Sequence, residues 1–507
     1  MAKLELSEYF SEIYKIGDIP RFKVLIDGKW TDTKETTDLI SPIDEKVVAQ
    51  ISTVSADQVK KALNSATLNK SKIRDMAAID RLELLNKARQ ELAKHKDEIV
   101  KVLMTESGKA FRTAGGEINA ALERMRLGME DSRKIMGEYI PGDWSSDTAQ
   151  KAALVIREPI GVVLGISPFN YPVYTSIAKV LPALLAGNAV VIKPPSADPL
   201  AFLMCAEIFR KTGLPSGTLQ VVTGSGEEVG DLLIKSSDIN MISFTGSTNV
   251  GKHISSIAGL KKTHLELGGK AAAVVLEDAD LDLAAKECVR GSIELAGQRC
   301  DAVSRILVVE KVYNEFVIQI KSHLKDYKFG NPFDGEEITV GPVISIKAAK
   351  RIDEMVQDAI KRGAKLVAGG KYKDAYYEPT LLVDVPLNAE IANEETFGPV
   401  ITVIKVKDAE DAIKVANNSN YGLDSCVFTE NFYKTWEVMK ALKAGNVTLN
   451  AAPSHGTAYF PFGGIKDSGQ GKEGVGYSIE EMTVMKTMIF NLAPKNLGKK
   501  YTGEFKD

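Results

Sequence analysis

One cysteine of the sequence stands among residues whose types could do chemistry together. The stretch LAGQRCDAVSR, residues 295 to 305, places Cys300 between Arg299 and Asp301 at the end of a segment that is typical of a helix. A cysteine attacks as its thiolate, and a free thiol with a pKa of about 8.5 is only a few per cent thiolate at neutral pH. Cys300 therefore needs activation if it is a nucleophile. The alternative is a buried, inert small side chain.

Two other residues would suit acyl chemistry at such a cysteine. Glu266 lies between two leucines in an apolar run, where a carboxylate is costly unless it is paired or its pKa is raised. It is a candidate general base, although a structural ion pair is the commoner explanation. Asn170 lies between Pro168 and Pro172, where a rigid amide could donate to an oxyanion or simply bond its own turn. Together with Cys300 as nucleophile, Glu266 as base and Asn170 as oxyanion donor would form a set suited to acyl chemistry, which no one of them indicates alone.

Three predicted turns between a strand and a helix are candidates for binding a nucleotide. The turn GSGEEVG contains Gly226, but a strict dinucleotide motif expects a glycine where Val229 stands. The turn FTGST puts Gly246 and Ser247 at a helix amino terminus, which favours a phosphate but is also an ordinary helix cap. Lys193 ends a third strand, at the sheet edge where doubly wound folds bind ligands.

The elements around these residues predict an α/β protein with mostly parallel sheets. The runs GVVLGI, NAVVIK, TLQVVTG and NMISFTG are short and continuously apolar, as in strands buried on both faces, and a helical pattern follows each. The pattern restarts after Gly268 and Gly269, a plausible hinge, with AAAVVLE, a long helix up to the cysteine, and RILVVE. This restart predicts a second α/β domain. Two β-type segments, residues 137–157 and EEMTVMKTMIFNL, fall outside this order and could pair with another subunit.

Composition limits the class of partner. The chain has 507 residues, 44% hydrophobic and 26% charged, with a net charge of -3, so two or three globular domains are expected. No block of charge suggests nucleic acid or an anionic membrane surface. No apolar run reaches the 18 residues of a membrane span, and no signal peptide is evident, so we expect a cytoplasmic protein. The four cysteines are too sparse for disulfides or a zinc site, so we expect reduced thiols and no metal.

Seven motifs, in order, resemble the aldehyde dehydrogenase family along essentially the whole chain. They are PFNYP (168–172), KPPS (193–196), FTGST (244–248), LELGGK (265–270), GQRC (297–300), EETFGPV (394–400) and PFGGIKDSG (461–469). Within the family, PFNYP, the arginine before the cysteine and the ending GYSIEEMTVMKTMIFN are most similar to the non-phosphorylating glyceraldehyde-3-phosphate dehydrogenases, in particular those from archaea.

The resemblance implies the aldehyde dehydrogenase fold. Its Rossmann-like cofactor-binding domain would comprise residues 1–137 and 158–267, and its α/β catalytic domain residues 268–465. A small β extension, residues 138–157 and 480–507, would bridge subunits, so we expect a homo-oligomer, either a dimer or a tetramer.

The resemblance also implies a mechanism and site residues. Cys300 would attack the aldehyde, the Asn170 amide and the Cys300 backbone N–H would hold the oxyanion, and hydride would pass to the nicotinamide. Glu266 would then activate the water that hydrolyses the thioester. A base for this step argues against the acylating relatives, which pass the acyl group to coenzyme A or phosphate.

The expected cofactor is NADP, with NAD also accepted. By resemblance, Lys193 contacts the adenosine ribose, Ser247 and its helix receive the pyrophosphate, and Glu395 with Phe397 positions the nicotinamide ribose. Members that prefer NAD often carry glutamate three residues after the lysine. Here that residue is Ser196, which does not repel a 2'-phosphate.

Arg299 points to an anionic substrate. An arginine directly before the nucleophile could bind a phosphate or a carboxylate, although an ion pair with Glu294 or Asp301 is the alternative. Arg124 and Arg126 are two apart on a helix, so at most one of them faces the site. The further expected substrate-binding residues are Tyr171, Arg124, His455 and Phe462.

These residues favour oxidation of glyceraldehyde 3-phosphate to 3-phosphoglycerate, a glycolytic step without phosphorylation. Succinate semialdehyde is the alternative with a carboxylate, and lactaldehyde or glyceraldehyde comes third. From another class, a catalytically silent dinucleotide-binding protein on the same fold would leave Cys300 as a buried hydrophobe.

Overall fold

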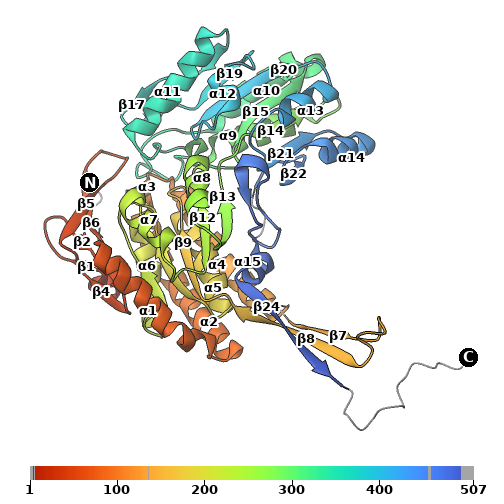
Figure 1. The fold of residues 1–507 in the computed structure, drawn as a ribbon. Helices are drawn as coiled ribbons and strands as arrows, with labels where there is room; N and C mark the ends of the chain where they lie inside the picture. The colour runs from red at the N-terminus through yellow and green to blue at the C-terminus, as the bar shows by residue number, and fades with distance from the viewer. Residues whose placement is uncertain (1–3, 5, 135, 455–457, 493–507) are drawn as a thin grey trace, which may run out of the picture.

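The computed structural model describes residue 4 and residues 6–134, 136–454 and 458–492. Figure 1 shows two α/β bodies, one built mainly from the red-to-green half of the chain and the other from the green-to-blue half. A thin antiparallel extension projects from the first body. The expected α/β class is confirmed.

The first body is built on an eight-stranded sheet in the order β23-β13-β12-β9-β10-β11-β3-β4. The run from β13 to β11 is parallel, and the strands at both edges are antiparallel. The strands are β3 (Val24–Ile26), β4 (Lys29–Thr31), β9 (Val162–Ile166), β10 (Ala189–Lys193), β11 (Leu219–Val221), β12 (Met241–Thr245), β13 (Lys262–Glu266) and β23 (Gly469–Gln470).

Helices cover both faces of this sheet, which explains why its strands are continuously apolar. Val162 and Leu164 of β9 pack in one core with α1, α7 and α8, whereas Val163 between them packs in the other core with α2 to α6. The helices are α1 (Ala56–Arg74), α2 (Ala78–Lys94), α3 (Lys96–Ser107), α4 (Phe111–Asp131), α5 (Pro172–Leu185), α6 (Leu200–Lys211), α7 (Asp231–Lys235), α8 (Thr248–Ile257) and α15 (Val475–Glu481).

The second body contains a seven-stranded sheet in the order β16-β19-β20-β15-β14-β21-β22, parallel except for β16. Its strands are β14 (Ala271–Val275), β15 (Val303–Val309), β16 (Lys365–Ala368), β19 (Thr380–Val383), β20 (Val400–Val406), β21 (Asp424–Phe428) and β22 (Asn446–Leu449). Its helices are α9 (Leu281–Ile293), α10 (Tyr313–His323), α11 (Ile346–Lys361), α12 (Glu390–Asn393), α13 (Ala409–Asn417) and α14 (Phe432–Ala441). The restart of the pattern after the glycine pair predicted this second sheet.

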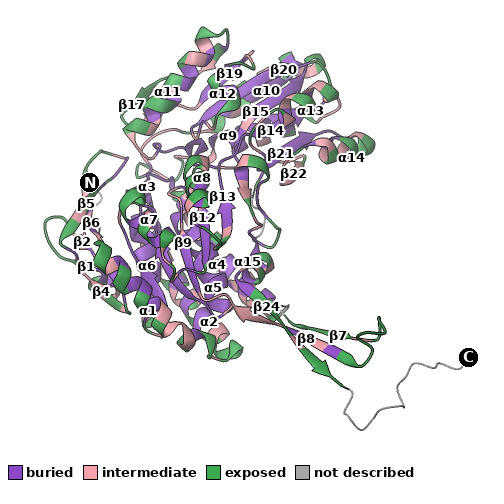
Figure 2. Ribbon diagram, viewed as in Figure 1, coloured by how far each residue is buried: buried purple, intermediate pink, exposed green. Residues whose placement is uncertain are grey.

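The two segments outside the predicted order pair with each other. Strands β7 (Glu138–Pro141), β8 (Lys151–Pro159) and β24 (Thr483–Asn491) form an antiparallel sheet in the order β24-β8-β7. Figure 2 shows this extension mostly exposed, in contrast to the buried strands of the two large sheets. Residues 493–507 of the predicted segment lie outside the described residues. Its role in subunit contact stays a prediction.

Smaller elements complete the structure. A four-stranded sheet near the amino terminus and a hairpin in the second body comprise β1 (Tyr14–Lys15), β2 (Arg21–Phe22), β5 (Glu35–Ile40), β6 (Val47–Thr53), β17 (Tyr372–Lys373) and β18 (Tyr376–Tyr377). Within the described parts of the chain, no helix has both the length and the apolar character needed to cross a membrane.

The prediction that a helix continues up to Cys300 is wrong. Helix α9 ends at Ile293, and Leu295, Ala296 and Gly297 follow with positive φ of 56°, 52° and 69°. A side chain at Gly297 would place its Cβ 2.0 Å from the carbonyl oxygen of Gly398. The left-handed turn therefore brings the chain close against a neighbouring segment just before the cysteine, and periodicity alone could not reveal this contact.

Candidate active site

A cavity of about 320 Å³ brings together the three residues predicted to do the chemistry, Asn170, Glu266 and Cys300. They come from separate elements: the loop before α5, the end of β13, and the loop between α9 and β15. Tyr171, Arg299 and Phe462 from the predicted substrate set line the same cavity. The resemblance is thus matched by a spatial cluster.

Glu266 is buried at the carboxyl end of β13. Neither of its carboxylate oxygens has a hydrogen-bond partner among the described residues, and Oε1 lies 3.2 Å from Nε2 of His264. Burial raises the pKa of Glu266 to about 7, although the neighbouring His264 opposes this rise. A carboxylate with a pKa near neutrality can both accept and release a proton at physiological pH.

His264 is a neighbour of Glu266 that the sequence interpretation missed. Its Nδ1 faces Oε2 of Glu481, so the imidazole lies between two carboxylates. Burial lowers the pKa of His264, but the interactions with Glu266 and Glu481 outweigh it and raise the pKa to about 9. At neutral pH, His264 is therefore a buried cation next to Glu266. Gly471 leaves room for it, because a Cβ there would lie 2.7 Å from Nδ1.

Cys300 is partly exposed and lies on the cavity wall. Burial raises the pKa of its thiol well above the usual range, and the carboxylates of Asp301 and Glu395 add to this effect. The backbone around it is crowded, since a Cβ at Gly269 would lie 2.2 Å from the Cys300 carbonyl oxygen. Gly269, the second glycine of LELGG, is thus required by this close approach.

Asn170 faces the cysteine loop. Its Nδ2 donates to the backbone oxygen of Gln298 at 2.9 Å, and the residue is buried. Pro172 begins α5 two residues later and restrains the loop that holds it. The amide group has a second N–H, which can serve another acceptor in the cavity.

Arg124 is not where the sequence interpretation expected it. Its Nη1 forms an ion pair with Glu473 at 3.0 Å and donates to the Tyr174 hydroxyl at 3.0 Å, and Arg124 does not line the cavity. Ala120, one turn earlier on α4, lines it instead. The substrate role predicted for Arg124 is therefore corrected to an internal ion pair. Arg126 lies on the exposed side of α4.

Lys179 is a second buried cation near Glu266. Its Nζ donates to Thr245 Oγ1 at 2.8 Å and lies 4.0 Å from a carboxylate oxygen of Glu473. Burial lowers the pKa of Lys179 to about 8, and the nearby Glu473 and Glu266 oppose this change. The side chain favours the ionised form of Glu266.

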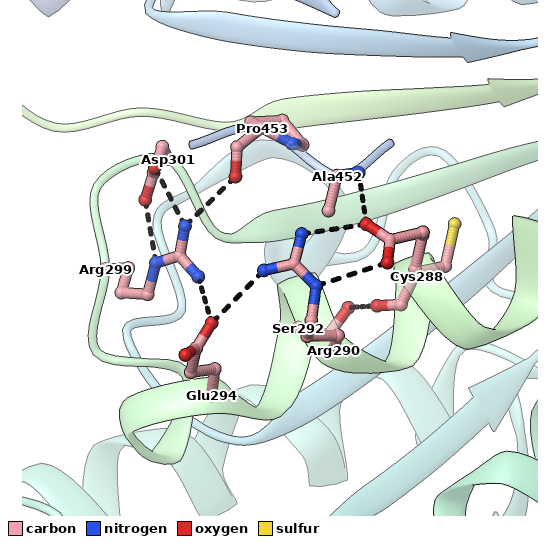
Figure 3. A network of polar contacts seen from close by, with 9 residues as sticks. Cys288, Arg290, Ser292, Glu294, Arg299, Asp301, Ala452 and Pro453 are labelled. Carbon is pink, nitrogen blue, oxygen red and sulfur yellow. Dashed lines mark hydrogen bonds and ion pairs between the residues drawn. The ribbon is translucent and has the colours of Figure 1, made fainter. Parts of the chain in front are cut away.

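Arg299 is held by acids, as the alternative interpretation proposed. Its Nε and Nη2 donate to Asp301 at 3.0 and 2.9 Å, and its Nη1 donates to Glu294 at 2.9 Å (Figure 3). Nη2 also donates to the Pro453 carbonyl at 3.0 Å. Arg299 still lines the cavity, but its charge is balanced in this structure.

Two further arginines line the cavity and were missed. Arg290 lies in the last turn of α9, and Arg112 lies in the first turn of α4. Arg112 is exposed, and no ion pair is recorded for it within the described residues. No sequence signal distinguishes either arginine from an ordinary surface residue. The predicted His455 lies outside the described residues.

A second cavity, of about 600 Å³, lies at the carboxyl ends of β9 and β10. Lys193, Gly226 and Gly230 line it, and a Cβ at either glycine would meet nothing within 4 Å. Lys193 is buried and donates to Ser196 Oγ at 3.3 Å, and burial lowers its pKa to about 8. Glu227 also lines this cavity and was missed. An open, glycine-lined groove beside a buried lysine fits a phosphorylated nucleotide.

The other predicted cofactor residues, Gly246, Ser247, Glu395 and Phe397, line neither of the two cavities. Ser247 is the N-cap of α8, where its Oγ accepts from Val250 N–H at 3.4 Å, directly after Gly246. Gly269 N–H donates to Glu395 Oε1 at 3.1 Å, and Phe397 has a φ of 51° and packs edge-on against Phe169. Among the described residues, no cluster of histidine, cysteine and acidic side chains is arranged to hold a metal ion.

Comparison with known proteins agrees with the motifs. Residues 30–488 match the model of the aldehyde dehydrogenase family. A curated NADP-dependent glyceraldehyde-3-phosphate dehydrogenase of Streptococcus equinus is 38% identical over 93% of this chain and 99% of its own length. A lactaldehyde dehydrogenase of Methanococcus aeolicus is 35% identical over 92% of this chain and 100% of its own length.

A solved structure shares the whole architecture. It is the NADP-dependent glyceraldehyde-3-phosphate dehydrogenase of Bacillus halodurans in complex with NADP, 37% identical in sequence. The alignment covers 93% of this chain and 99% of that chain, with a TM-score of 0.91. The fold predicted from the motifs is thus confirmed.

Proposed function

This chain belongs to the aldehyde dehydrogenase family, and on that premise we propose that it oxidises a small polar aldehyde to the acid through a thioester on Cys300, with NADP as oxidant. The observation that carries the proposal is the meeting of Asn170, Glu266 and Cys300 on one cavity wall. No one of these residues would suffice, because each alone has a structural explanation.

The proposed reaction begins with deprotonation of Cys300, whose proton passes to solvent. The thiolate attacks the carbonyl carbon, a C–S bond forms, and the carbonyl electron pair moves to oxygen. The second N–H of Asn170 and the backbone N–H of Cys300 donate to this oxyanion. NADP, when bound, accepts the hydride that leaves the carbon as the C=O bond is restored.

Glu266 serves the second half of the reaction. Its carboxylate takes a proton from water, hydroxide attacks the thioester, and the C–S bond breaks to release the acid and regenerate the thiolate. A pKa of about 7 suits this task, because roughly half of the groups are ionised at neutral pH. The buried cations His264 and Lys179 favour the ionised form.

The groove beside Lys193 and Ser196 supports NADP as the preferred cofactor, with NAD also accepted. Lys193 would contact the adenosine ribose, and Ser196 adds no negative charge against a 2'-phosphate. The turns with Gly226 and with Gly246 and Ser247 would hold the phosphates, and Glu395 and Phe397 the nicotinamide ribose. The NADP-dependent relatives support this assignment.

Glyceraldehyde 3-phosphate, oxidised to 3-phosphoglycerate, is the first candidate substrate. Arg112, Arg290 and Arg299 on the cavity wall favour an anionic aldehyde, and two of the relatives described above are named for this substrate. The second candidate is a neutral hydroxyaldehyde such as lactaldehyde or glyceraldehyde. Two observations support this second candidate. Asp301 and Glu294 balance the positive charge of Arg299, and the chain is similar to a lactaldehyde dehydrogenase.

The family fold suggests a separate role for each part of the chain. We assign residues 1–137 and 158–267 to cofactor binding, 268–465 to catalysis, and 138–157 with 480–507 to contact between subunits of a dimer or tetramer. The exposed strands of the extension support the last assignment.

The test is a rapid-mixing assay with NADP and four aldehydes: glyceraldehyde 3-phosphate, succinate semialdehyde, lactaldehyde and glyceraldehyde. We expect a burst of reduced nicotinamide with the true substrate, and no burst in Cys300→Ala. A burst that survives in Cys300→Ala would refute the thioester mechanism, and turnover of none of these aldehydes would refute the substrate class.

A further inference from the structure

Two arginines on the cavity wall share a single carboxylate. Arg290 donates from Nε and Nη2 to Glu287 at 3.3 and 2.7 Å, just as Arg299 donates from Nε and Nη2 to Asp301. Each arginine is thereby left with Nη1. Both Nη1 groups lie next to the same oxygen, Oε2 of Glu294, at 3.4 Å from Arg290 and 2.9 Å from Arg299 (Figure 3).

The two acids that accept from Nε and Nη2 of the arginines, Glu287 and Asp301, are fixed in place. Asp301 is buried, and the Glu287 carboxylate also accepts the Ala452 N–H at 3.0 Å. The Pro453 carbonyl accepts from Arg299, so the segment 452–453 contacts both Glu287 and Arg299. The two guanidinium groups are therefore aimed by partners that do not depend on Glu294.

Glu294, in contrast, is held only by these two arginines among the interactions recorded for the described residues. Its side chain is 41% exposed, compared with 1% for Asp301 and 16% for Glu287. Because it is half-exposed, the Glu294 side chain can rotate toward solvent, which the buried Asp301 cannot do. The three charged groups of this site, Arg290, Glu294 and Arg299, all line the cavity that contains Cys300.

The charges also show that an anion can bind here only after Glu294 has moved away. Glu287 and Asp301 balance the two arginines, and Glu294 adds a third negative charge. Glu294 thus occupies a position where two N–H donors from separate guanidinium groups converge, which is the arrangement that binds phosphate or carboxylate.

We propose that Arg290 and Arg299 form a two-arginine site for the anionic tail of the aldehyde, and that Glu294 fills this site in the free protein and swings out when an anion binds. The inference rests on the proposed aldehyde oxidation. It makes Glu294 a specificity-determining residue, because an anionic aldehyde must compete with it and a neutral aldehyde need not.

The test compares Glu294→Gln with the native protein on glyceraldehyde 3-phosphate and glyceraldehyde. The two ion pairs of Glu294 are together worth about 1 kcal/mol, so we expect kcat/KM for the phosphorylated over the unphosphorylated aldehyde to rise about fivefold. Glu130→Gln is the matched control, since Glu130 forms a similar exposed pair with Arg126 four residues away. This control should leave the ratio unchanged, and an unchanged ratio in Glu294→Gln would overturn the proposal.

A binding measurement separates the site from the reaction. Inorganic phosphate, titrated into the native protein and the variants by calorimetry, should bind about fivefold more tightly to Glu294→Gln and about tenfold more weakly to Arg290→Gln. Equal affinities in all three proteins would overturn the site even if the aldehydes are oxidised. If no aldehyde is oxidised but phosphate affinities change as expected, the site stands and the proposed function fails.

Discussion

Burial sets the proton affinities of the two reactive groups on the cavity wall. The thiol of Cys300 has a pKa well above its usual range because it is desolvated and faces Asp301 and Glu395. Glu266, also desolvated, has a pKa of about 7. Both groups are therefore protonated more readily than in water, and loss of a proton is the step that the surrounding residues must assist.

Asn170→Ala tests the proposed oxyanion contact. Removal of one such donor typically costs about 3 to 4 kcal/mol of transition-state stabilisation, so hydride transfer in a single turnover should slow by two to three decades. NADP affinity, measured by fluorescence titration, should not change. A loss of less than tenfold would count against a role for Asn170 in the reaction.

His264→Gln tests the buried cation beside Glu266. Activity that needs ionised Glu266 rises as pH increases through its pKa, which is about 7 while cationic His264 is present. Removal of this cation raises the pKa of Glu266, so the rising limb of the thioester-hydrolysis profile should move to higher pH. His323→Gln, which removes an exposed pair with Asp282, is the control. A uniform loss of rate at all pH values would indicate a purely structural role for His264.

Among the elements, the left-handed turn after α9 and the groove at the ends of β9 and β10 are the segments that aim the reactive groups. The turn exists because Gly297 tolerates both a positive φ and the close approach of Gly398. In the groove, a Cβ at Gly226 or Gly230 would meet nothing within 4 Å, so the backbone there borders open space.

Gly297→Ala and Gly259→Ala separate backbone strain from steric conflict. The two glycines have similar φ values of 69° and 65°, but a Cβ at Gly259 would meet nothing within 4 Å. Gly259→Ala should therefore cost only about 1 to 2 kcal/mol of unfolding free energy in urea. Gly297→Ala should cost more and should also slow the burst, because Cys300 lies three residues further on. Equal effects on stability and burst would contradict this account.

Glu227→Gln tests the electrostatics of the nucleotide groove. Glu227 lines the groove, and its carboxylate disfavours the extra phosphate of NADP. Because the side chain is exposed and screened, the ratio of kcat/KM for NADP over NAD should rise by only about two- to threefold. Glu228→Gln is the neighbouring control, since Glu228 does not line the groove. An identical rise in both variants would point to net charge instead.

The molecule as a whole carries an extension with no core of its own. Strand β24 pairs with β8 along its full length, and both faces expose apolar side chains, among them Tyr139, Ile489 and Phe490. Exposed apolar strands of this kind are costly in water unless another chain covers them. This argues for subunit contact through the extension.

Ile489→Asp tests this contact. A buried, unpaired carboxylate at a subunit interface is strongly unfavourable, so the molar mass from light scattering should shift toward the monomer. Leu260→Asp is the control, because Leu260 is fully exposed on a loop of the first body. An unchanged mass for Ile489→Asp would place the subunit contact elsewhere.

The sequence by itself determined the family, the two mostly parallel sheets and the two β-type segments of the extension. These features are local or repetitive: strands buried on both faces are continuously apolar, and motifs such as LELGGK stand at strand ends. It also nominated Asn170, Glu266 and Cys300, which the fold brings into one cavity.

Only the tertiary structure decided how charges pair and where α9 stops. Arg124 meets Glu473, and His264 meets Glu481, across more than 200 residues of sequence, and no local pattern reports such contacts. The left-handed turn after α9 lies against Gly398, and the charge of Arg299 is balanced by Asp301 and Glu294. The sequence thus named the candidate reactive groups, whereas the packing of distant segments set their pKa values and determined which arginines line the cavity.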